Sequence, residues 1–270
     1  MKIGVPTYGR KPLKAPAPET VPEKDWTLLY VLNGDNDLRE AATLDLVELD
    51  RMGTPKNVAA VCQLYRGDLK WSLKNLGRKL SSLGSAEMKP AVRPDWRGMK
   101  VFEVRSEDSG STTQEVGRTH FAEPTTPSDP KALTDFVAWG MEAYPARHYA
   151  VILGGHGSLD GVMSDARGEK MTFADAAQAL KAASERTGRT IDTVLLDSCA
   201  TASEQTAQAF RGATQYLVAS PEVIRGGGWS ESETLEFLKD NPQAGAREFA
   251  QSLVEGQHPG VNRATLYATG

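Results

Sequence analysis

The sequence has few cysteines and no long apolar run. Its 270 residues include only two cysteines, too few for a disulfide framework, and neither has the spacing of a zinc site. No run of about 18 apolar residues occurs, so no membrane-spanning helix is expected. The N-terminal segment lacks the apolar stretch of a signal peptide, which predicts a cytoplasmic protein as written. Secretion after loss of a leader stays open.

The sequence also lacks a basic excess and a phosphate-binding motif. Lys and Arg number 31 against 35 Asp and Glu, a balance that argues against a nucleic-acid partner. No Gly-Lys-Ser/Thr ending is present for a phosphate-binding loop. A tyrosine-phosphatase loop needs an Arg six residues after its cysteine, but Gln205 stands six residues after Cys199.

Apolar strand-like runs alternate with helix-like runs along most of the chain. The strands are predicted at 26–33, 57–65, 99–105, 148–155, 191–197 and 215–220, with a last one near the end, and the helices at 35–52, 130–144, 172–188, 200–210, 231–239 and 243–255. This alternation predicts right-handed crossovers and a three-layer α/β/α fold around a mainly parallel sheet.

The remaining segments divide the chain into a tail and one domain. Residues 1–24 are rich in proline and are predicted to be an extended tail, so that 25–270 would form the domain. Residues 66–97 have no regular pattern, and a hairpin within them is left open. Residues 106–128 are rich in Ser, Thr, Gly and Pro, which predicts a long surface loop.

Cys199 lies where an apolar strand run stops and a helix-like run begins. Its side chain is therefore expected at the carboxyl edge of the sheet, where open α/β folds bind their ligands. A helix N-terminus behind it would favour the thiolate. The alternative is a thiol that packs as a small apolar group, which is the interpretation we give Cys62 inside its strand.

His156 also follows an apolar strand, in a glycine-rich turn. One helical crossover separates its strand from that of Cys199, so the two side chains are expected at one edge of the sheet. Thiol catalysis needs such a pair, because the imidazole takes the thiol proton and later protonates the leaving amine. The backbone amides of Gly157 and Cys199 are placed to hold the oxyanion.

Four segments give the chain a resemblance to a known family. They are "WTLLYVLNGDNDLREAATLDLVEL", "YAVILGGHGS", "VLLDSCATAS" and "YLVASPEVIRGGGW", which cover most of residues 26–229. The chain resembles the clostripain-like cysteine peptidases, relatives of caspases, legumains and gingipains. The resemblance implies a caspase-like fold and a cysteine endopeptidase with a His156/Cys199 dyad acting on polypeptides. A catalytically silent caspase-like module for binding or regulation is the alternative function.

The resemblance also implies a preference for Arg or Lys before the cleaved bond. It places Asp197 in an acidic S1 pocket, whereas the residues alone leave open a carboxylate that caps the following helix. The segment after "VAS" departs from the family pattern at Ile224, Arg225 and Gly227. Arg225 is therefore expected either to repel a basic side chain or to pair with Asp197.

Two further features concern processing and metals. Arg167 and Lys170 lie in 164–173, an expected exposed loop where family members are often processed, so self-cleavage after either residue is predicted. The alternative is a basic loop that is never cut. Residues 35–37 are expected to cap a helix, and no cofactor is predicted. Calcium stays open because some members of the family use it. The oligomeric state is left open.

Overall fold

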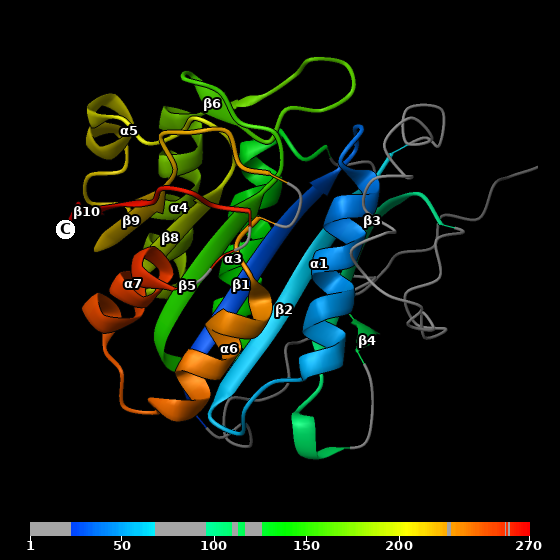
Figure 1. The fold of residues 1–270 in the computed structure, drawn as a ribbon, viewed down its shortest axis with the longest axis vertical. Coiled ribbons are helices and arrows are strands. Elements are labelled where there is room, and N and C mark those ends of the chain that lie inside the picture. The colour runs from blue at the N-terminus through cyan, green and yellow to red at the C-terminus, as the bar shows by residue number, and fades with distance from the viewer. Residues whose placement is uncertain are drawn as a thin grey trace, which may run out of the picture.

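The computed structural model describes residues 23–67, 96–109, 113–116, 126–225, 228–256, 258 and 260–270. The predicted tail 1–24 lies outside the described residues except for its last two, and Lys24 already belongs to the first strand, so the predicted end of the tail is one residue too late. The hairpin left open within 66–97 lies mostly outside the described residues. In the described part, strands and helices alternate as predicted (Figure 1).

A mixed sheet of eight strands forms the centre of the described structure, with the order β10-β9-β8-β5-β1-β2-β3-β4. The strands are β1 (Lys24–Gly34), β2 (Val58–Arg66), β3 (Gly98–Val104), β4 (Gln114–Val116), β5 (Ala146–Gly154), β8 (Thr193–Asp197), β9 (Tyr216–Ala219) and β10 (Thr265–Ala268). The five central strands are parallel, and β3, β4 and β10 are antiparallel at the two edges. The prediction of a mainly parallel sheet is confirmed.

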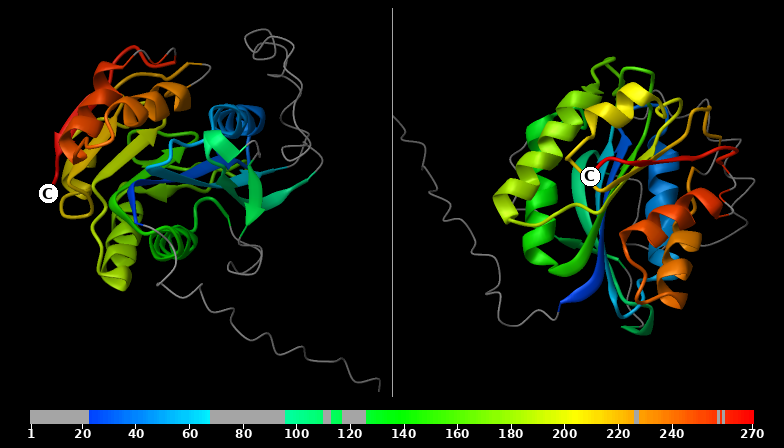
Figure 2. Two further views of the ribbon diagram at one scale, coloured as in Figure 1. Left: turned by 90° about the horizontal axis from the view of Figure 1, so that it is seen from below. Right: turned by 90° about the vertical axis from the view of Figure 1, so that its left-hand side faces the viewer.

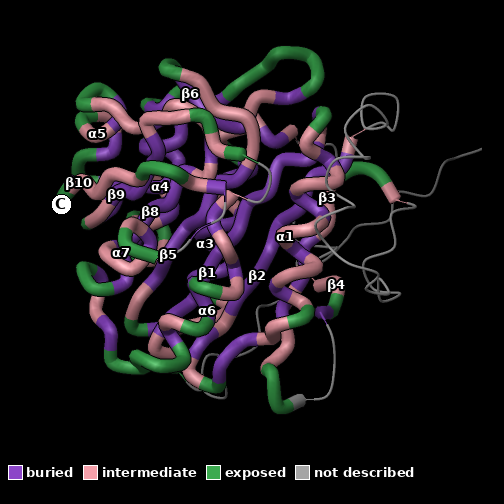
Figure 3. Tube along the Cα trace, viewed as in Figure 1, coloured by how far each residue is buried: buried purple, intermediate pink, exposed green. Residues whose placement is uncertain are grey.

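Helices cover both faces of this sheet, so the three-layer α/β/α prediction is also confirmed. Figure 2 shows α3 (Pro130–Ala143) and α4 (Phe173–Thr187) on one side, and α1 (Arg39–Met52), α6 (Glu231–Asp240) and α7 (Ala246–Glu255) on the other. Alternate residues of β1 supply the two cores: Leu29 packs in the α3–α4 core and Leu28 in the α1–α6–α7 core. Figure 3 shows the central strands buried, as their continuous apolar runs require.

Three predicted boundaries need correction. The helix expected from residue 35 begins at Arg39, and the interval 106–128 contains a 3-10 turn (Glu107–Ser109) and the edge strand β4. The helix expected over 200–210 is reduced to α5 (Glu204–Ala209). A short hairpin of β6 (Gly161–Val162) and β7 (Met171–Thr172) was not predicted. Among the described residues, no helix has the length and apolar character that a bilayer crossing demands.

Candidate active site

His156 and Cys199 follow two neighbouring parallel strands. Strand β5 pairs with β8 so that Gly154 lies opposite Asp197, and the Gly155 N–H donates to the Asp197 carbonyl at 3.1 Å. His156 and Cys199 each stand two residues beyond this last pair. Their expected position at adjacent strand ends is therefore what the structure shows.

Gly157 packs directly against the turn that carries Cys199. A Cβ at Gly157 would lie 2.6 Å from Ser198 Cβ and 3.0 Å from the Cys199 carbonyl oxygen, so this contact requires glycine. Among the described residues, no hydrogen bond uses the amide of Gly157 or that of Cys199. Two backbone donors are thus available beside the thiol.

The turn after Cys199 has an unusual backbone. Ala200 adopts φ +54°, a left-handed conformation that costs a non-glycine residue energy. The next amides do not enter a helix, because the Ala200 N–H donates to Glu222 O (2.9 Å) and the Thr201 N–H to Ser220 O (2.9 Å). Helix α5 starts only after Ser203, whose side chain caps it. The expected helix N-terminus behind the thiol was therefore a wrong prediction.

The two cysteines occupy different environments. Cys62 is fully buried in β2, and this burial raises the pKa of its thiol well above the usual value. Cys199 is partly exposed, and its Sγ accepts a hydrogen bond from the Ile224 N–H at 3.3 Å. Only Cys199 combines partial exposure with a nearby histidine. The interpretation of Cys62 as a packing residue agrees with the structure.

Asp37 contacts the imidazole of His156. The Nε2 atom lies 2.5 Å from Asp37 Oδ1, within hydrogen-bond distance. Asp37 was expected to cap a helix, but the N-cap position is Leu38 and no side chain caps α1. Asn36 turns the chain before α1 instead, since its Oδ1 accepts from the Leu38 N–H. Asp37 reaches His156 because its loop follows β1, which lies beside β5 in the sheet.

His156 and Cys199 both line one cavity of about 290 Å³. Its lining includes His156, Cys199, Asp197, Val223, Arg225 and Gly228, together with Leu38, Ala41, Ala42 and Asp45 of α1. Asp197 packs against backbone at Gly228, where a Cβ would lie 2.5 Å from Asp197 Oδ2. The expected pocket carboxylate therefore lines the same cavity as the thiol and the imidazole.

The segment expected to be an exposed loop at 164–173 is exposed at its tip, residues 166–170, and again at Thr172. Asp165 is buried and accepts from the backbone N–H groups of Arg167 and Glu169, and Arg167 Nη2 lies 2.7 Å from Asp165 Oδ2. Lys170 pairs with Asp160, and the next residue, Met171, is buried in β7. The tip is therefore exposed but tightly folded around one carboxylate.

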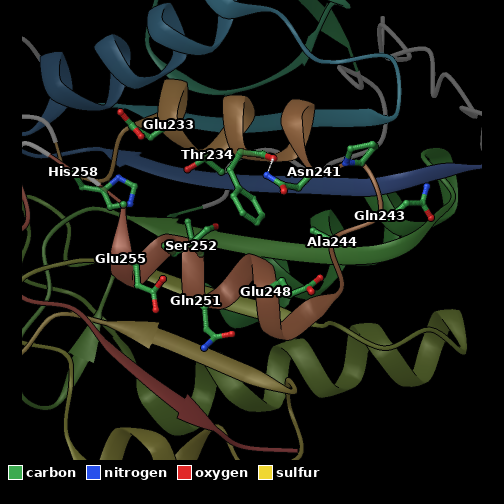
Figure 4. Close-up of a pocket in the computed structure, with 14 residues that line it drawn as sticks. Glu233, Thr234, Asn241, Gln243, Ala244, Glu248, Gln251, Ser252, Glu255 and His258 are labelled. Carbon is green, nitrogen blue, oxygen red and sulfur yellow. Dashed lines mark hydrogen bonds between the residues drawn. The ribbon is translucent and has the colours of Figure 1, made fainter.

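Two other observations bear on ligands. In the described ranges, no group of three or more His, Cys, Asp or Glu side chains is arranged to hold a metal. A second cavity, of about 700 Å³, lies between α6 and α7 and shares no lining residue with the first (Figure 4). Glu233, Glu248 and Glu255 line it, without any cysteine.

The sequence matches the clostripain family over residues 31–267. No curated protein matches it. A secreted C11 cysteine protease from Bacteroides thetaiotaomicron, solved with an irreversible peptide inhibitor, has 18% identity and a TM-score of 0.61, with 86% of this chain and 58% of that one covered.

Two further solved structures are similar. "Iotapain", a secreted C11 cysteine protease from the same organism, has 11% identity and a TM-score of 0.63, covering 92% and 67% of the two chains. An inactive zymogen C11 protease from Parabacteroides distasonis has 19% identity and a TM-score of 0.60, covering 92% and 63%. This chain thus spans 58% to 67% of the length of these structures. The similarities confirm the predicted caspase-like fold.

Proposed function

The chain belongs to the clostripain family, and we propose that it is a cysteine endopeptidase that cleaves peptide bonds after Arg or Lys. One observation carries the proposal: the ends of the paired strands β5 and β8 bring His156 and Cys199 to a single cavity. A thiol and an imidazole at one edge of a sheet are the two groups that nucleophilic thiol catalysis needs.

The residues divide the reaction between them. The His156 imidazole takes the proton from Cys199 Sγ, and the thiolate attacks the carbonyl carbon of the peptide bond. The imidazolium then gives its proton to the leaving amine, which leaves an acyl-enzyme that water hydrolyses. Because Nε2 is engaged by Asp37, Nδ1 is the nitrogen that exchanges a proton with the thiol. Asp37 thereby fixes the orientation of the ring.

Two backbone amides stabilise the oxyanion that forms when the thiolate attacks. The Gly157 and Cys199 N–H groups donate to no other group among the described residues. The contact of Gly157 with the Ser198 side chain and the Cys199 carbonyl oxygen holds the two amides in a fixed relation. Fixed donors of this kind stabilise developing charge without having to reorganise.

Asp197 selects the residue before the cleaved bond. Its carboxylate lines the cavity beside Cys199, and a positively charged substrate side chain would compensate its charge. Arg225 lines the same cavity and is exposed. A preference for acidic or small residues at P1 would assign control of the pocket to Arg225.

Self-cleavage after Arg167 or Lys170 belongs to the same proposal. The bond after Arg167 lies within the exposed tip, whereas the bond after Lys170 leads into the buried Met171. Exposure therefore favours cleavage after Arg167, once its pairing with Asp165 is released. Purified wild-type protein should yield two fragments that Cys199→Ala protein does not yield.

The peptidase proposal is tested with fluorogenic peptides that differ only at P1. Arg and Lys substrates should be hydrolysed, and Cys199→Ala should abolish hydrolysis while the protein stays folded. Iodoacetamide should label Cys199 far faster than the buried Cys62. Slow, equal labelling without hydrolysis would instead favour the catalytically silent binding module.

A further inference from the structure

We infer that Asp45 of helix α1 is a second specificity-determining carboxylate for the P1 side chain, acting together with Asp197. This inference rests on the proposed function, because it concerns the same cavity. Asp45 belongs to helix α1, whereas Asp197 ends strand β8, so the two acids reach the pocket from different elements. With both acids present, we expect Arg to be preferred over Lys at P1.

One face of helix α1 lines the cavity with apolar residues and one acidic residue, which suits a long basic side chain. Leu38, Ala41, Ala42 and Asp45 line the cavity, and their spacing of i, i+3, i+4 and i+7 places them on one face of the helix. Leu38 follows Asp37, the partner of His156. Asp45 stands seven residues further along, about 10 Å at the rise of an α-helix. An apolar stretch thus leads from the dyad to an acid.

The electrostatics place Asp45 and Asp197 near a common point. Glu231 of α6 is only 4% exposed, and burial, Asp45, Glu48 and Asp197 all raise the pKa of its carboxyl group. The Glu231 Oε2 atom has no hydrogen-bond partner among the described residues. Asp45 and Asp197 therefore both lie close enough to act on this buried carboxyl group, and both line the cavity, as does Arg225.

Two carboxylates that line one cavity can both accept hydrogen bonds from a single cationic side chain. A guanidinium group presents five N–H donors along several edges of one plane, so it can bridge acids that approach from two elements. The Lys ammonium is a compact point charge and cannot span them in the same way. Arg is therefore the P1 residue that this pair of acids fits best.

Helix α1 offers a matched control for Asp45. Glu48 stands three residues later and also raises the pKa of Glu231, but it does not line the cavity. Its Oε1 accepts hydrogen bonds from Ser230 Oγ at 3.0 Å and Ser232 N–H at 2.9 Å. Glu48→Gln therefore removes an acid from the same helix without changing the pocket wall.

The test compares kcat/KM for peptides with Arg, Lys or citrulline at P1, because citrulline keeps the shape of Arg without its charge. Asp45→Asn should lower the Arg/citrulline ratio by about tenfold or more, the effect expected for loss of a charged hydrogen-bond partner. The Arg/Lys ratio should fall as well. Glu48→Gln should leave both ratios unchanged, and the rate of Cys199 alkylation by iodoacetamide should be the same in all variants.

The outcomes separate this inference from the proposed function. If Asp197→Asn lowers the Arg/citrulline ratio and Asp45→Asn does not, the role of Asp45 is refuted and the peptidase proposal stands. If wild-type protein hydrolyses citrulline as well as Arg, the basic specificity fails and Asp45 with it. Absence of any hydrolysis, with Cys199 labelled no faster than Cys62, refutes both.

A second variant covers the case in which Asp45→Asn does not fold. Ala41 is partly exposed on the same wall, so Ala41→Leu should fill the cavity between the dyad and Asp45. Hydrolysis after Arg should fall at least tenfold, while iodoacetamide still reaches Cys199 at the wild-type rate. Unchanged hydrolysis after Arg in Ala41→Leu would show that α1 does not line the P1 pocket, and would overturn the inference.

Discussion

Gly157→Ala is expected to inactivate the protein without removing any catalytic group. The added methyl group would lie 2.6 Å from Ser198 Cβ, 2.8 Å from Thr201 Cγ2 and 3.0 Å from Cys199 O. Ordinary carbon contacts are about 3.5 to 4.0 Å, so the two turns must separate by about 1 Å. The substitution keeps the N–H group of residue 157 but displaces it from the thiol.

The size of the effect follows from this displacement. A shift of about 1 Å in a catalytic arrangement costs on the order of 100-fold in rate, so kcat/KM toward a P1-Arg peptide should fall by about that factor. Overpacking of this kind also costs about 1 to 3 kcal/mol of stability. Hydrolysis should be measured well below the unfolding temperature, with circular dichroism to establish that the protein is folded.

Gly245→Ala serves as the control for Gly157→Ala. A Cβ at Gly245 meets no atom within 4 Å, and this residue lies at the start of α7, away from the dyad. Its activity should equal that of wild type. A folded Gly157→Ala protein with wild-type kcat/KM would refute the argument that this contact sets the geometry of the two turns.

Three further predictions concern stability. Cys62→Ala should retain activity and lose about 1 kcal/mol in urea unfolding, because it leaves a small cavity in the core; full loss of hydrolysis would mean that the wrong thiol has been assigned. Ala200→Gly should gain about 1 kcal/mol by relieving the left-handed backbone, and a loss would contradict the strain inferred there. Burial raises the pKa of the Glu231 carboxyl group well above its ordinary value of 4.5, so the folded protein holds this proton more tightly than the unfolded chain does. Wild type should therefore lose stability relative to Glu231→Gln as pH rises above 4.5. Urea unfolding of both proteins at about pH 5 and pH 8 measures this difference, which should grow with pH.

The strands of the sheet were predictable because their apolar runs are continuous. Leu28 and Leu29 are both buried, one on each face of the sheet, and only a strand covered by helices on both sides explains such a run. The pairing of β5 with β8 was expected because one helical crossover connects them. The placement of His156 and Cys199 at one edge therefore came from local patterns alone.

The segment after Cys199 was not predictable in this way. The run from Ala200 to Phe210 has helical composition, but its first amides bond to Ser220 and Glu222, which are distant in sequence. Tertiary contacts thus outweigh helix propensity, and Ser203 caps a helix of only six residues. The left-handed conformation of Ala200 could not be predicted, because the glycine that usually marks such a backbone position is absent there.

Asp37 and Asp45 show why a site on a sheet edge draws on elements far apart in sequence. In the sheet, β1 lies between β5 and β2, so the loop after β1 reaches the same edge as His156 (Figure 1). The helix that follows runs back over the sheet and turns one face toward the cavity. Asp37 reaches the imidazole because it precedes that helix, and Asp45 reaches the cavity because it stands on the correct face. Both positions depend on the neighbour of β5, which no pattern within residues 35–52 reveals.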